Sequence, residues 1–179
     1  MAGNQQDLER LVEHIAKVEH RPVHEWNPER SGSIDIDIHR DGSWSHQGSL
    51  IKRQSLVRLF ASVLRKDGDD YFLVTPVEKL KINVEIAPFV VTALQVFHSG
   101  SEEQVISGNT NLDEQFVVDE SHPLRVNTTA EGDPLPYVEL RDGLTGLLNR
   151  SVWMELADFV VEENSILGVW SSGTFFELQ

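Results

Sequence analysis

The distribution of apolar residues along the chain predicts both helices and strands. In Asp7–Val18 the apolar side chains recur every three or four residues, which predicts an amphipathic helix. In Ile34–Ile38 isoleucines alternate with acidic residues, and this period of two predicts a half-buried strand. The Asp41-Gly42 pair that follows is typical of a tight turn, so Trp44 and His46 are expected on a hairpin partner strand.

Two further helices and several strands are predicted beyond this hairpin. Gln54–Lys66 and Asn149–Glu163 each carry one apolar face at helical spacing. Turn-forming residues separate the strand candidates, which are Tyr71–Val74, Lys81–Ile86, Val90–Phe97, Gln104–Ser107, Gln115–Val118 and Tyr137–Leu140. Strands that are segregated from a few helices predict an α+β fold.

The order of these elements predicts three parts. We expect an N-terminal helix in residues 1–19, an α+β domain in residues 20–87, and a β-rich domain with one long helix in residues 88–179. Pro88 marks the expected boundary between the two domains, because proline interrupts regular structure.

One structural unit is predicted to occur twice. Residues 36–74 and 137–178 both read as a strand, an Asp-Gly turn, an arginine, an amphipathic helix and a strand. Placing Arg53 on Arg150 places Leu59 on Leu156, so we expect these leucines to be equivalent core residues. Such a duplication predicts two related halves that face each other across an interface, which is a common location for a ligand.

Charge is unevenly distributed along the chain, which carries a formal net charge of -14. Residues 1–81 contain 12 basic and 13 acidic side chains, whereas residues 82–179 contain 3 basic and 16 acidic ones. The acidic second half repels long polyanions, which argues against duplex DNA or RNA as a partner. A small anion stays compatible with this charge, because charges further apart than a Debye length of about 8 Å are largely screened.

Composition also restricts the chemistry and the location of the protein. The chain contains no cysteine, which excludes disulfides and thiolate chemistry. No apolar run approaches the about 20 residues that a membrane-spanning helix needs. The first residues lack the pattern of a signal peptide. We therefore expect a cytoplasmic protein without a membrane partner, and no motif specifies a cofactor.

The clearest candidate for a binding site is a group of cations near the predicted helix Gln54–Lys66. Lys52 and Arg53 directly precede the helix, where its dipole disfavours cations but favours an anion. Arg58 and Arg40 can join them, and an arginine fork suits a phosphate group. The alternative is that these side chains lie in solvent or pair with the many carboxylates.

Two other patterns invite a functional interpretation. Asp35, Asp37 and His39 lie on one face of the predicted strand and can be metal ligands, although the polar face of a half-exposed strand explains them better. Trp44 or Trp170 can stack on a nucleotide base, or can pack in the core.

Eight short segments together match a known family. They are Arg40-Asp41-Gly42-Ser43-Trp44, Ile51-Lys52-Arg53, Thr75-Pro76-Val77-Glu78-Lys79, Ala87-Pro88-Phe89, Asn109-Thr110-Asn111, His122-Pro123-Leu124, Pro136-Tyr137 and Trp170-Ser171-Ser172-Gly173. In this combination the chain resembles the bacterial family called domain of unknown function 1285 (DUF1285) over residues 20–178. The resemblance implies a two-part fold with an internal duplication. It also implies that the C-terminal part is a strongly bent antiparallel sheet or roll with a helix, loosely like a pleckstrin-homology domain.

The resemblance further implies a role in signal transduction through a nucleotide-type ligand held between the two parts. We therefore expect a non-catalytic module for a small anionic ligand. Its expected contacts are Arg40, Trp44, Lys52, Arg53, Arg58, Thr75, Glu78, His122 and Arg141. Two alternatives stay open: an adaptor whose acidic C-terminal half docks a basic protein partner, and a metal-assisted hydrolase built on Asp35, Asp37 and His39.

Overall fold

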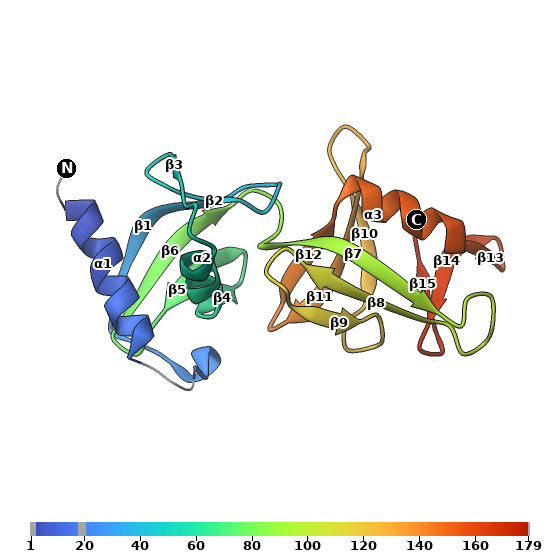
Figure 1. Ribbon diagram of the computed structural model, residues 1–179, viewed down its shortest axis with the longest axis horizontal. Helices are drawn as coiled ribbons and strands as arrows, with labels where there is room; N and C mark the ends of the chain where they lie inside the picture. The colour runs from blue at the N-terminus through green and yellow to red at the C-terminus, as the bar shows by residue number, and fades with distance from the viewer. Residues whose placement is uncertain (1–2, 18–20, 179) are drawn as a thin grey trace. The chain divides into compact units, whose positions relative to one another are not determined.

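The structure is a computed structural model that describes residues 3–17 and 21–178. The chain divides into two compact units, Met1–Ile86 and Ala87–Gln179, which we call the N-terminal and the C-terminal unit. Both consist mainly of sheet with helices packed against it, which confirms the mixed α+β class (Figure 1). Within the described residues, no helix is long and apolar enough to cross a membrane.

The N-terminal unit is built on a six-stranded sheet. Its helical elements are α1 (Gly3–Ala16), the 3-10 turn η1 (Val23–Glu25) and α2 (Gln54–Ala61). Its strands are β1 (Arg30–Ile38), β2 (Trp44–His46), β3 (Ser49–Leu50), β4 (Leu64–Asp67), β5 (Asp70–Val74) and β6 (Glu78–Val84). The strand order is β3-β2-β1-β6-β5-β4, in which β1 and β6 run parallel.

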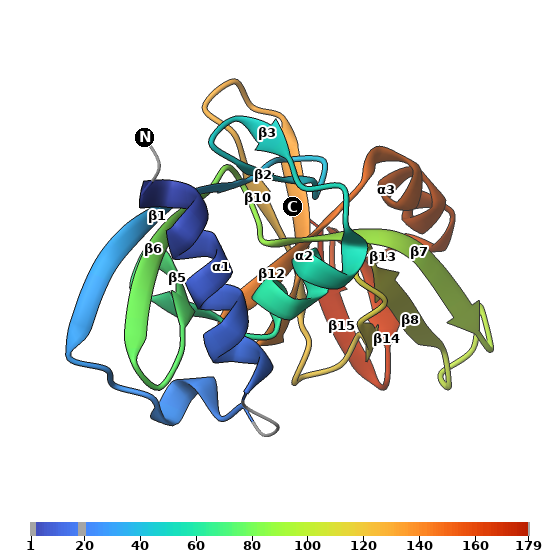
Figure 2. The same cartoon turned by 60° about the vertical axis from the view of Figure 1, so that its left-hand side comes forward.

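The core of the N-terminal unit lies between one face of this sheet and the two helices. The isoleucines at positions 34, 36 and 38 of β1 are all buried, as the alternation predicted. Leu11 of α1 and Phe60 of α2 are fully buried as well. α1 contacts both α2 and β1, so both helices cover the apolar face (Figures 1 and 2). Val18 and His20 of the N-terminal region lie outside the described residues.

The C-terminal unit contains a six-stranded and a three-stranded sheet. The larger sheet comprises β7 (Phe89–Phe97), β8 (Val105–Thr110), β9 (Gln115–Val117), β10 (Leu124–Thr128), β11 (Pro134–Arg141) and β12 (Leu144–Leu148). Then follow α3 (Arg150–Leu156), the 3-10 turn η2 (Ala157–Phe159), and the small sheet of β13 (Val161–Glu163), β14 (Ile166–Ser171) and β15 (Thr174–Glu177). The expectation of an antiparallel sheet is wrong for the central pair, because β7 and β12 run parallel.

Both predicted long helices are shorter than expected. α2 ends at Ala61 because Leu64–Asp67 pairs with β5 as a strand. α3 ends at Leu156 because Val161–Glu163 pairs with β14. In both places an apolar pair that fits a helical face also fits the first residues of a strand, so the periodicity alone could not locate the helix end.

The two six-stranded sheets have the same strand order. Each consists of two antiparallel three-stranded meanders joined by a central parallel pair, and β4 occupies the edge position that β10 occupies in the second sheet. The predicted equivalence of residues 36–74 and 137–178 is wrong in register, because the second segment is divided between two sheets. Leu59 is only half-buried whereas Leu156 is fully buried, so these two residues are not equivalent.

Candidate functional site

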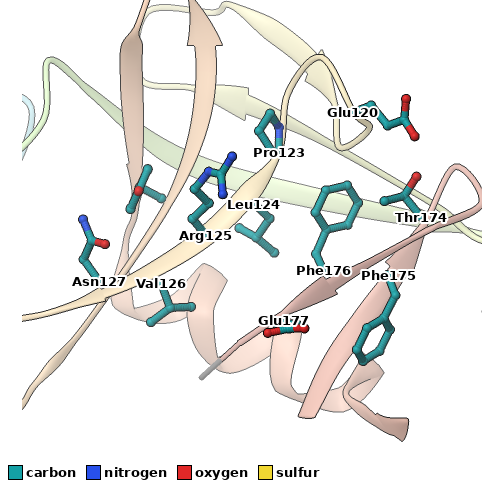
Figure 3. Close-up of a pocket in the computed structure, with 11 residues that line it drawn as sticks. Glu120, Pro123, Leu124, Arg125, Val126, Asn127, Thr174, Phe175, Phe176 and Glu177 are labelled. Carbon is teal, nitrogen blue, oxygen red and sulfur yellow. The ribbon is translucent and has the colours of Figure 1, made fainter. Parts of the chain in front are cut away.

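A groove in the C-terminal unit runs between the edges of its two sheets. β10 is the last strand of the larger sheet, and β15 is the last strand of the smaller one. The groove has a volume of about 670 Å³ and is lined by Glu120, Pro123, Leu124–Asn127, Tyr137 and Thr174–Glu177 (Figure 3). Successive side chains of a strand point to opposite faces. The groove is lined by consecutive residues of β10 and of β15, so each strand presents its edge, and not one of its faces, to the groove. The backbone groups of both edges therefore lie along the groove.

Hydrogen bonding determines which backbone groups of β10 are already used. Glu139 N donates to Pro123 O at 3.1 Å, and Thr129 N donates to Asp133 O at 2.9 Å. Bonded pairs recur at every second residue of an antiparallel ladder. The backbone groups that point away from β11 therefore belong to the alternate residues Leu124, Val126 and Thr128.

Two prolines of β11 agree with this assignment. Pro136 lies opposite Val126 and Pro134 lies opposite Thr128. These are the non-bonded pairs of the ladder, so the missing proline N–H groups remove no bond between β10 and β11. The outward N–H groups of Val126 and Thr128 thus belong to an intact edge strand.

The edge of β15 is also unpaired. Leu178 N donates to Leu167 O at 2.9 Å, which fixes the alternation of the β14–β15 ladder. The backbone groups of Phe175 and Glu177 consequently point away from β14. Within the described part of the chain, no backbone hydrogen bond joins β10 to β15. The rings of Phe175 and Phe176 point to opposite sides of β15 (Figure 3).

The hairpin that carries β15 is rigidly attached to the larger sheet. The hydroxyl of Ser171 is fully buried, accepts from Ile106 N at 2.9 Å and donates to Val118 O at 2.6 Å. At the turn, Ser172 and Gly173 both have positive φ, 53° and 75°, as the tightest hairpin turns require. The family-like segment Trp170-Ser171-Ser172-Gly173 therefore forms the turn and the attachment of this hairpin.

The turn that leads into β10 is fixed by Asp119. Its carboxylate accepts backbone N–H bonds from Ser121 and His122, both at 2.8 Å. Burial favours the neutral acid, but these bonds outweigh burial and hold the pKa of Asp119 below its ordinary value. His122 Nδ1 lies 3.3 Å from the same carboxylate oxygen. His122, an expected ligand contact, thus contributes to the turn at the start of β10.

The charges along the groove favour a cationic ligand. Glu120 and Glu177 line it with carboxylates. Arg125 is the basic side chain of the lining, and its Nε donates to Glu139 Oε1 at 2.8 Å. Because Glu139 already neutralises Arg125, the two other carboxylates dominate the local potential.

The four cations expected near the start of α2 all lie exposed in the N-terminal unit. Arg53 is the N-cap residue of α2 and its side chain makes no capping hydrogen bond. Among residues 3–17 and 21–178, neither Lys52 nor Arg53 has an ion-pair partner. Arg58 lies further along the same helix, and Arg40 lies in the β1–β2 turn, where its backbone N donates to Glu85 at 2.8 Å. Anion binding by this group stays a prediction.

Two other expected contacts are core residues. Trp44 is 1% exposed and stacks on Phe60 with 6.3 Å between ring centroids, so it has no free face for a base. Thr75 is buried, and its Oγ1 accepts from Glu78 N at 3.1 Å, which fixes the turn before β6. The matching Thr-Pro-Val-Glu segment therefore forms a structural turn.

Glu78 is a fully buried carboxylate. Arg10 Nη2 and His14 Nδ1 of α1 both lie 3.4 Å from it, and Arg30 Nε of β1 lies 3.8 Å from it. A buried charge is tolerated only when it is paired. Glu78 therefore connects α1 to the sheet, and its carboxylate oxygens are engaged by these three side chains.

Arg141 belongs to the C-terminal unit. Its Nε lies 3.3 Å from Glu114 Oε1, and its guanidinium lies 5.5 Å from the centre of the Phe89 ring. The ion pair and the cation–π contact hold this side chain over the first strand of the larger sheet. Its role in ligand binding stays a prediction.

One hydrogen-bonded chain in the N-terminal unit was missed by the sequence analysis. Glu85 Oε1 lies 2.8 Å from His39 Nδ1, and His39 Nε2 lies 2.8 Å from Ser45 Oγ. The bond with Glu85 raises the pKa of His39, and the same bond lowers the pKa of Glu85. The order carboxylate, imidazole, hydroxyl is that of serine hydrolases. However, Ser45 is only 4% exposed and belongs to β2, which lies between β1 and β3. His39 directly follows β1 and Glu85 directly follows β6, so the hydrogen-bonded chain connects the ends of these two strands to β2.

The metal-ligand interpretation of β1 gains no support from these contacts. Asp37 accepts a hydrogen bond from Asn83 Nδ2 at 3.0 Å, and His39 is engaged as described. Asp35 is exposed. In the part of the chain that the structure describes, no group of three or more histidine, cysteine, aspartate or glutamate side chains is positioned to hold a metal ion.

These observations define a two-unit α+β protein with a groove between two sheet edges, and its family follows from sequence comparison. Residues 21–87 match the family model described as domain of unknown function (DUF1285), N-terminal domain. Residues 88–178 match the model described as protein of unknown function (DUF1285), C-terminal domain. The chain therefore belongs to the DUF1285 family, as the resemblance of its segments indicated.

Solved structures of the same family resemble this chain. A DUF1285 family protein from Silicibacter pomeroyi DSS-3 is 40% identical, with 94% of each chain covered and a TM-score of 0.87. A DUF1285 family protein from Shewanella baltica OS155 is 26% identical, with 69% of this chain and 90% of that chain covered and a TM-score of 0.53. No curated protein matches the chain.

Proposed function

We propose that this protein is a non-catalytic adaptor whose C-terminal unit binds an extended, basic segment of a partner protein. The groove between β10 and β15 is the binding site. The observation that carries this proposal is the pair of unpaired sheet edges that border one acidic groove.

The backbone supports recognition by strand addition. The outward groups of Val126 and Thr128 can pair with one extended segment, in the manner of domains that add a peptide strand to a sheet edge. Such pairing provides affinity without selecting a sequence, because it uses the backbone only. Phe175 and Glu177 on the opposite side of the groove then select among side chains.

The charge supports a basic segment. Glu120 and Glu177 lie along the groove, and the surrounding unit is strongly acidic. Acidic and basic surfaces attract each other during encounter, which raises the association rate at low salt. A nucleotide-type anion is repelled by the same carboxylates, so the groove favours the adaptor over the small-anion module.

A defined peptide tests this function. The probe is acetylated, amidated Val-Arg-Val-Arg-Val, and its acidic counterpart is Val-Glu-Val-Glu-Val. We expect calorimetry to detect binding of the basic peptide and none of the acidic one. The Val126→Pro variant should bind the basic peptide about tenfold or more weakly, because it lacks an outward N–H and crowds the edge.

A matched variant controls for the side chain. Val126→Ala keeps the N–H and shortens the side chain, so it should bind the basic peptide like the wild type. Circular dichroism verifies that both variants fold. Equal affinity of the Val126→Pro variant and the wild type for the basic peptide would exclude strand addition at β10.

We propose small-anion binding at the start of α2 as a second candidate function. Lys52 and Arg53 are exposed and lack ion-pair partners among the described residues, and an anion there would also accept the first free N–H groups of the helix. With ATP as the probe, Arg53→Ala should weaken binding by about 1.5–3 kcal/mol. Arg150→Ala removes the same charge from the C-terminal unit and is the control, which should bind ATP like the wild type. Calorimetry that gives one affinity for the wild type and Arg53→Ala rules this candidate out.

We also propose an internal duplication in a new register, with residues 30–84 equivalent to residues 89–148. The shared strand order of the two larger sheets supports this proposal. Superposing β1–β6 on β7–β12, strand by strand, tests it. The likeness to a pleckstrin-homology domain and the role in signal transduction stay predictions.

A further inference from the structure

A second cavity of the C-terminal unit, of about 600 Å³, lies on the exposed face of the small sheet. Its apolar walls include Phe159, Val161 and Trp170, and its acidic groups are Glu102 and Glu163. Trp170 is 38% exposed, which is unusual for so large an apolar side chain. An accessible indole beside carboxylates is the combination that recognises organic cations.

The indole and the nearest carboxylate hold each other in position. Trp170 Nε1 donates to Glu163 Oε1 at 3.3 Å. The remaining lone pairs of the Glu163 carboxylate are free to accept from a ligand, because one carboxylate accepts several hydrogen bonds. The negative charge thus lies at the margin of the ring.

A buried glutamine holds the rim of the cavity. Gln104 is 6% exposed, and its Nε2 donates to Trp170 O at 2.8 Å. Gly100 N donates to Gln104 Oε1 at 3.0 Å, and Ser172 N donates to Gln104 O at 2.9 Å. The bonds to Trp170 and Ser172 connect the loop before β8 to the turn end of the β14–β15 hairpin, and the bond from Gly100 closes the loop itself. The site is therefore preformed, which lowers the entropic cost of binding.

We propose that this cavity binds the guanidinium group of an arginine. A planar guanidinium can stack on Trp170 and donate to Glu163 at the same time, which a compact ammonium group cannot do equally well. The inference rests on the proposed adaptor function and names the side chain that its partner presents. Phe175 lies between the groove and this cavity. It lines the groove, and its ring centre lies 5.4 Å from the ring centre of Trp170.

A neutral-ended arginine derivative tests the cavity separately from the groove. The probe is N-acetyl-arginine methylamide, and the citrulline derivative is its uncharged analogue. The readout is the indole N–H signal of Trp170 in NMR spectra, assigned by its loss in Trp170→Phe. We expect the arginine derivative to shift this signal with saturation, and the citrulline derivative to leave it unchanged.

Two matched substitutions distinguish a local contact from general acidity. Glu163→Gln should weaken binding of the arginine derivative about tenfold, because a charge-assisted bond becomes a neutral one. Glu162→Gln removes the same charge from the neighbouring residue, whose side chain points to the other face of β13, and should leave the affinity unchanged. Equal weakening in both variants, or no saturable shift with the wild type, overturns the proposal.

The two proposals can fail independently. If the arginine derivative binds beside Trp170 but Val126→Pro does not affect the pentapeptide, the groove proposal fails and the cation site stands. If the pentapeptide binds in a manner that depends on Val126 but the Trp170 signal does not respond to either probe, the cation site fails and the groove stands.

Discussion

The strands β4 and β10 occupy the same edge position in sheets of the same strand order, yet only one edge is open. The edge of β4 is covered by the segment around η1. Arg65 Nη1 donates to Val23 O at 3.0 Å and to Trp26 O at 2.7 Å, and only 12% of the Arg65 side chain is exposed. The edge of β10 borders a groove instead.

The difference shows that the segments flanking a sheet determine whether its edge strand is covered or accessible. The N-terminal unit has a covering segment before its first strand, and α2 connects its two meanders. The C-terminal unit has a short loop at that connection, and its helix is followed by the hairpin that carries β15. The edge of β10 therefore lies beside the edge of β15, whereas the edge of β4 is covered by the segment around η1.

The composition of the two edge strands agrees with this contrast. β4 contains Leu-Arg-Lys-Asp, and charged residues of this kind protect an edge from unwanted pairing. β10 contains Leu-Arg-Val-Asn-Thr, whose single charge is neutralised by Glu139. The β10 edge thus lacks the usual protection and is suited to an intended partner.

The largest expected effect concerns the anchor of α2, the helix that only the first sheet has between its meanders. Phe60 is fully buried, so Phe60→Ala should lower the free energy of unfolding by about 3–5 kcal/mol. The adjacent Leu59 is half-buried, and Leu59→Ala should cost about 1 kcal/mol. Urea unfolding followed by tryptophan fluorescence measures both. Equal losses would mean that α2 packs differently.

The next effect concerns the attachment of the β14–β15 hairpin, which only the second sheet has. Ser171→Ala leaves the buried Ile106 N without its acceptor and removes one of two hydroxyl bonds to Val118 O, the other coming from Ser172 Oγ at 3.1 Å. We expect a loss of about 2–4 kcal/mol in the free energy of unfolding, since an unsatisfied buried group costs about 1–3 kcal/mol and a lost hydrogen bond about 0.5–1.5 kcal/mol. The exposed neighbour Ser172 provides the control, because Ser172→Ala removes only the longer bond to Val118 O and should cost less than about 1 kcal/mol. A Ser171→Ala protein as stable as this control would show that water replaces the hydroxyl.

A smaller effect concerns the cover of β4. Arg65→Ala removes two bonds to carbonyl oxygens and the ion pair with Asp67. The expected loss is about 1.5–3 kcal/mol, the range for hydrogen bonds to a charged group. Lys66→Ala, on the same strand, should cost about 0.5–1 kcal/mol. This substitution removes only the cation–π contact with Tyr71, and a contact of this kind contributes about that much at exposed sites. If thermal melts rank the two variants in reverse, Arg65 does not hold the cover.

The smallest effect is a pH dependence of the N-terminal unit. The pKa of His39 is raised above 6.5 by the bond with Glu85, so its contribution to stability is complete below pH 6.5 and is lost as the pH rises through the raised pKa. The pKa of Glu85 is lowered from 4.5, so its contribution is complete above pH 4.5 and is lost as the pH falls through the lowered pKa. The bond therefore stabilises most between pH 4.5 and 6.5.

Urea unfolding of the wild type and of His39→Gln between about pH 5 and pH 9 tests the bond. The wild type should lose its advantage over the variant as the pH is raised above the pKa of His39. The control His98→Asn, in an exposed loop of the C-terminal unit, should follow the wild type at every pH. A constant difference between wild type and His39→Gln from pH 5 to pH 9 would contradict the titration of this bond.

Local sequence patterns were sufficient to predict the first hairpin and most strands. The alternation at Ile34, Ile36 and Ile38 and the Asp41-Gly42 turn predicted β1 and β2, because both signals depend on neighbouring residues. Leu124–Thr128 was not predicted, since it has only two apolar side chains and its partner strand supplies the rest of its pairing.

The candidate groove was beyond the reach of sequence patterns. Leu124–Asn127 and Thr174–Glu177 belong to different sheets and are brought together by long-range packing. The expected anion site rested on adjacent residues, Lys52 and Arg53, and the structure confirms only that they are exposed at the start of α2. Trp44 was expected to stack on a base, and Glu78 was expected as a contact through the family-like segment Thr75–Lys79, but burial assigns both to the core.

Backbone hydrogen exchange of β10 and β4 with the Val-Arg-Val-Arg-Val peptide tests the central claim most directly. The amides of Val126 and Thr128 point to the open edge and should exchange more slowly once the peptide is bound, whereas Lys66 on β4 should be unaffected. The peptide has one strand to add, so protection is expected at alternate residues of β10. Binding of the peptide with unchanged exchange at Val126 and Thr128, or equal protection of Lys66, would contradict the account.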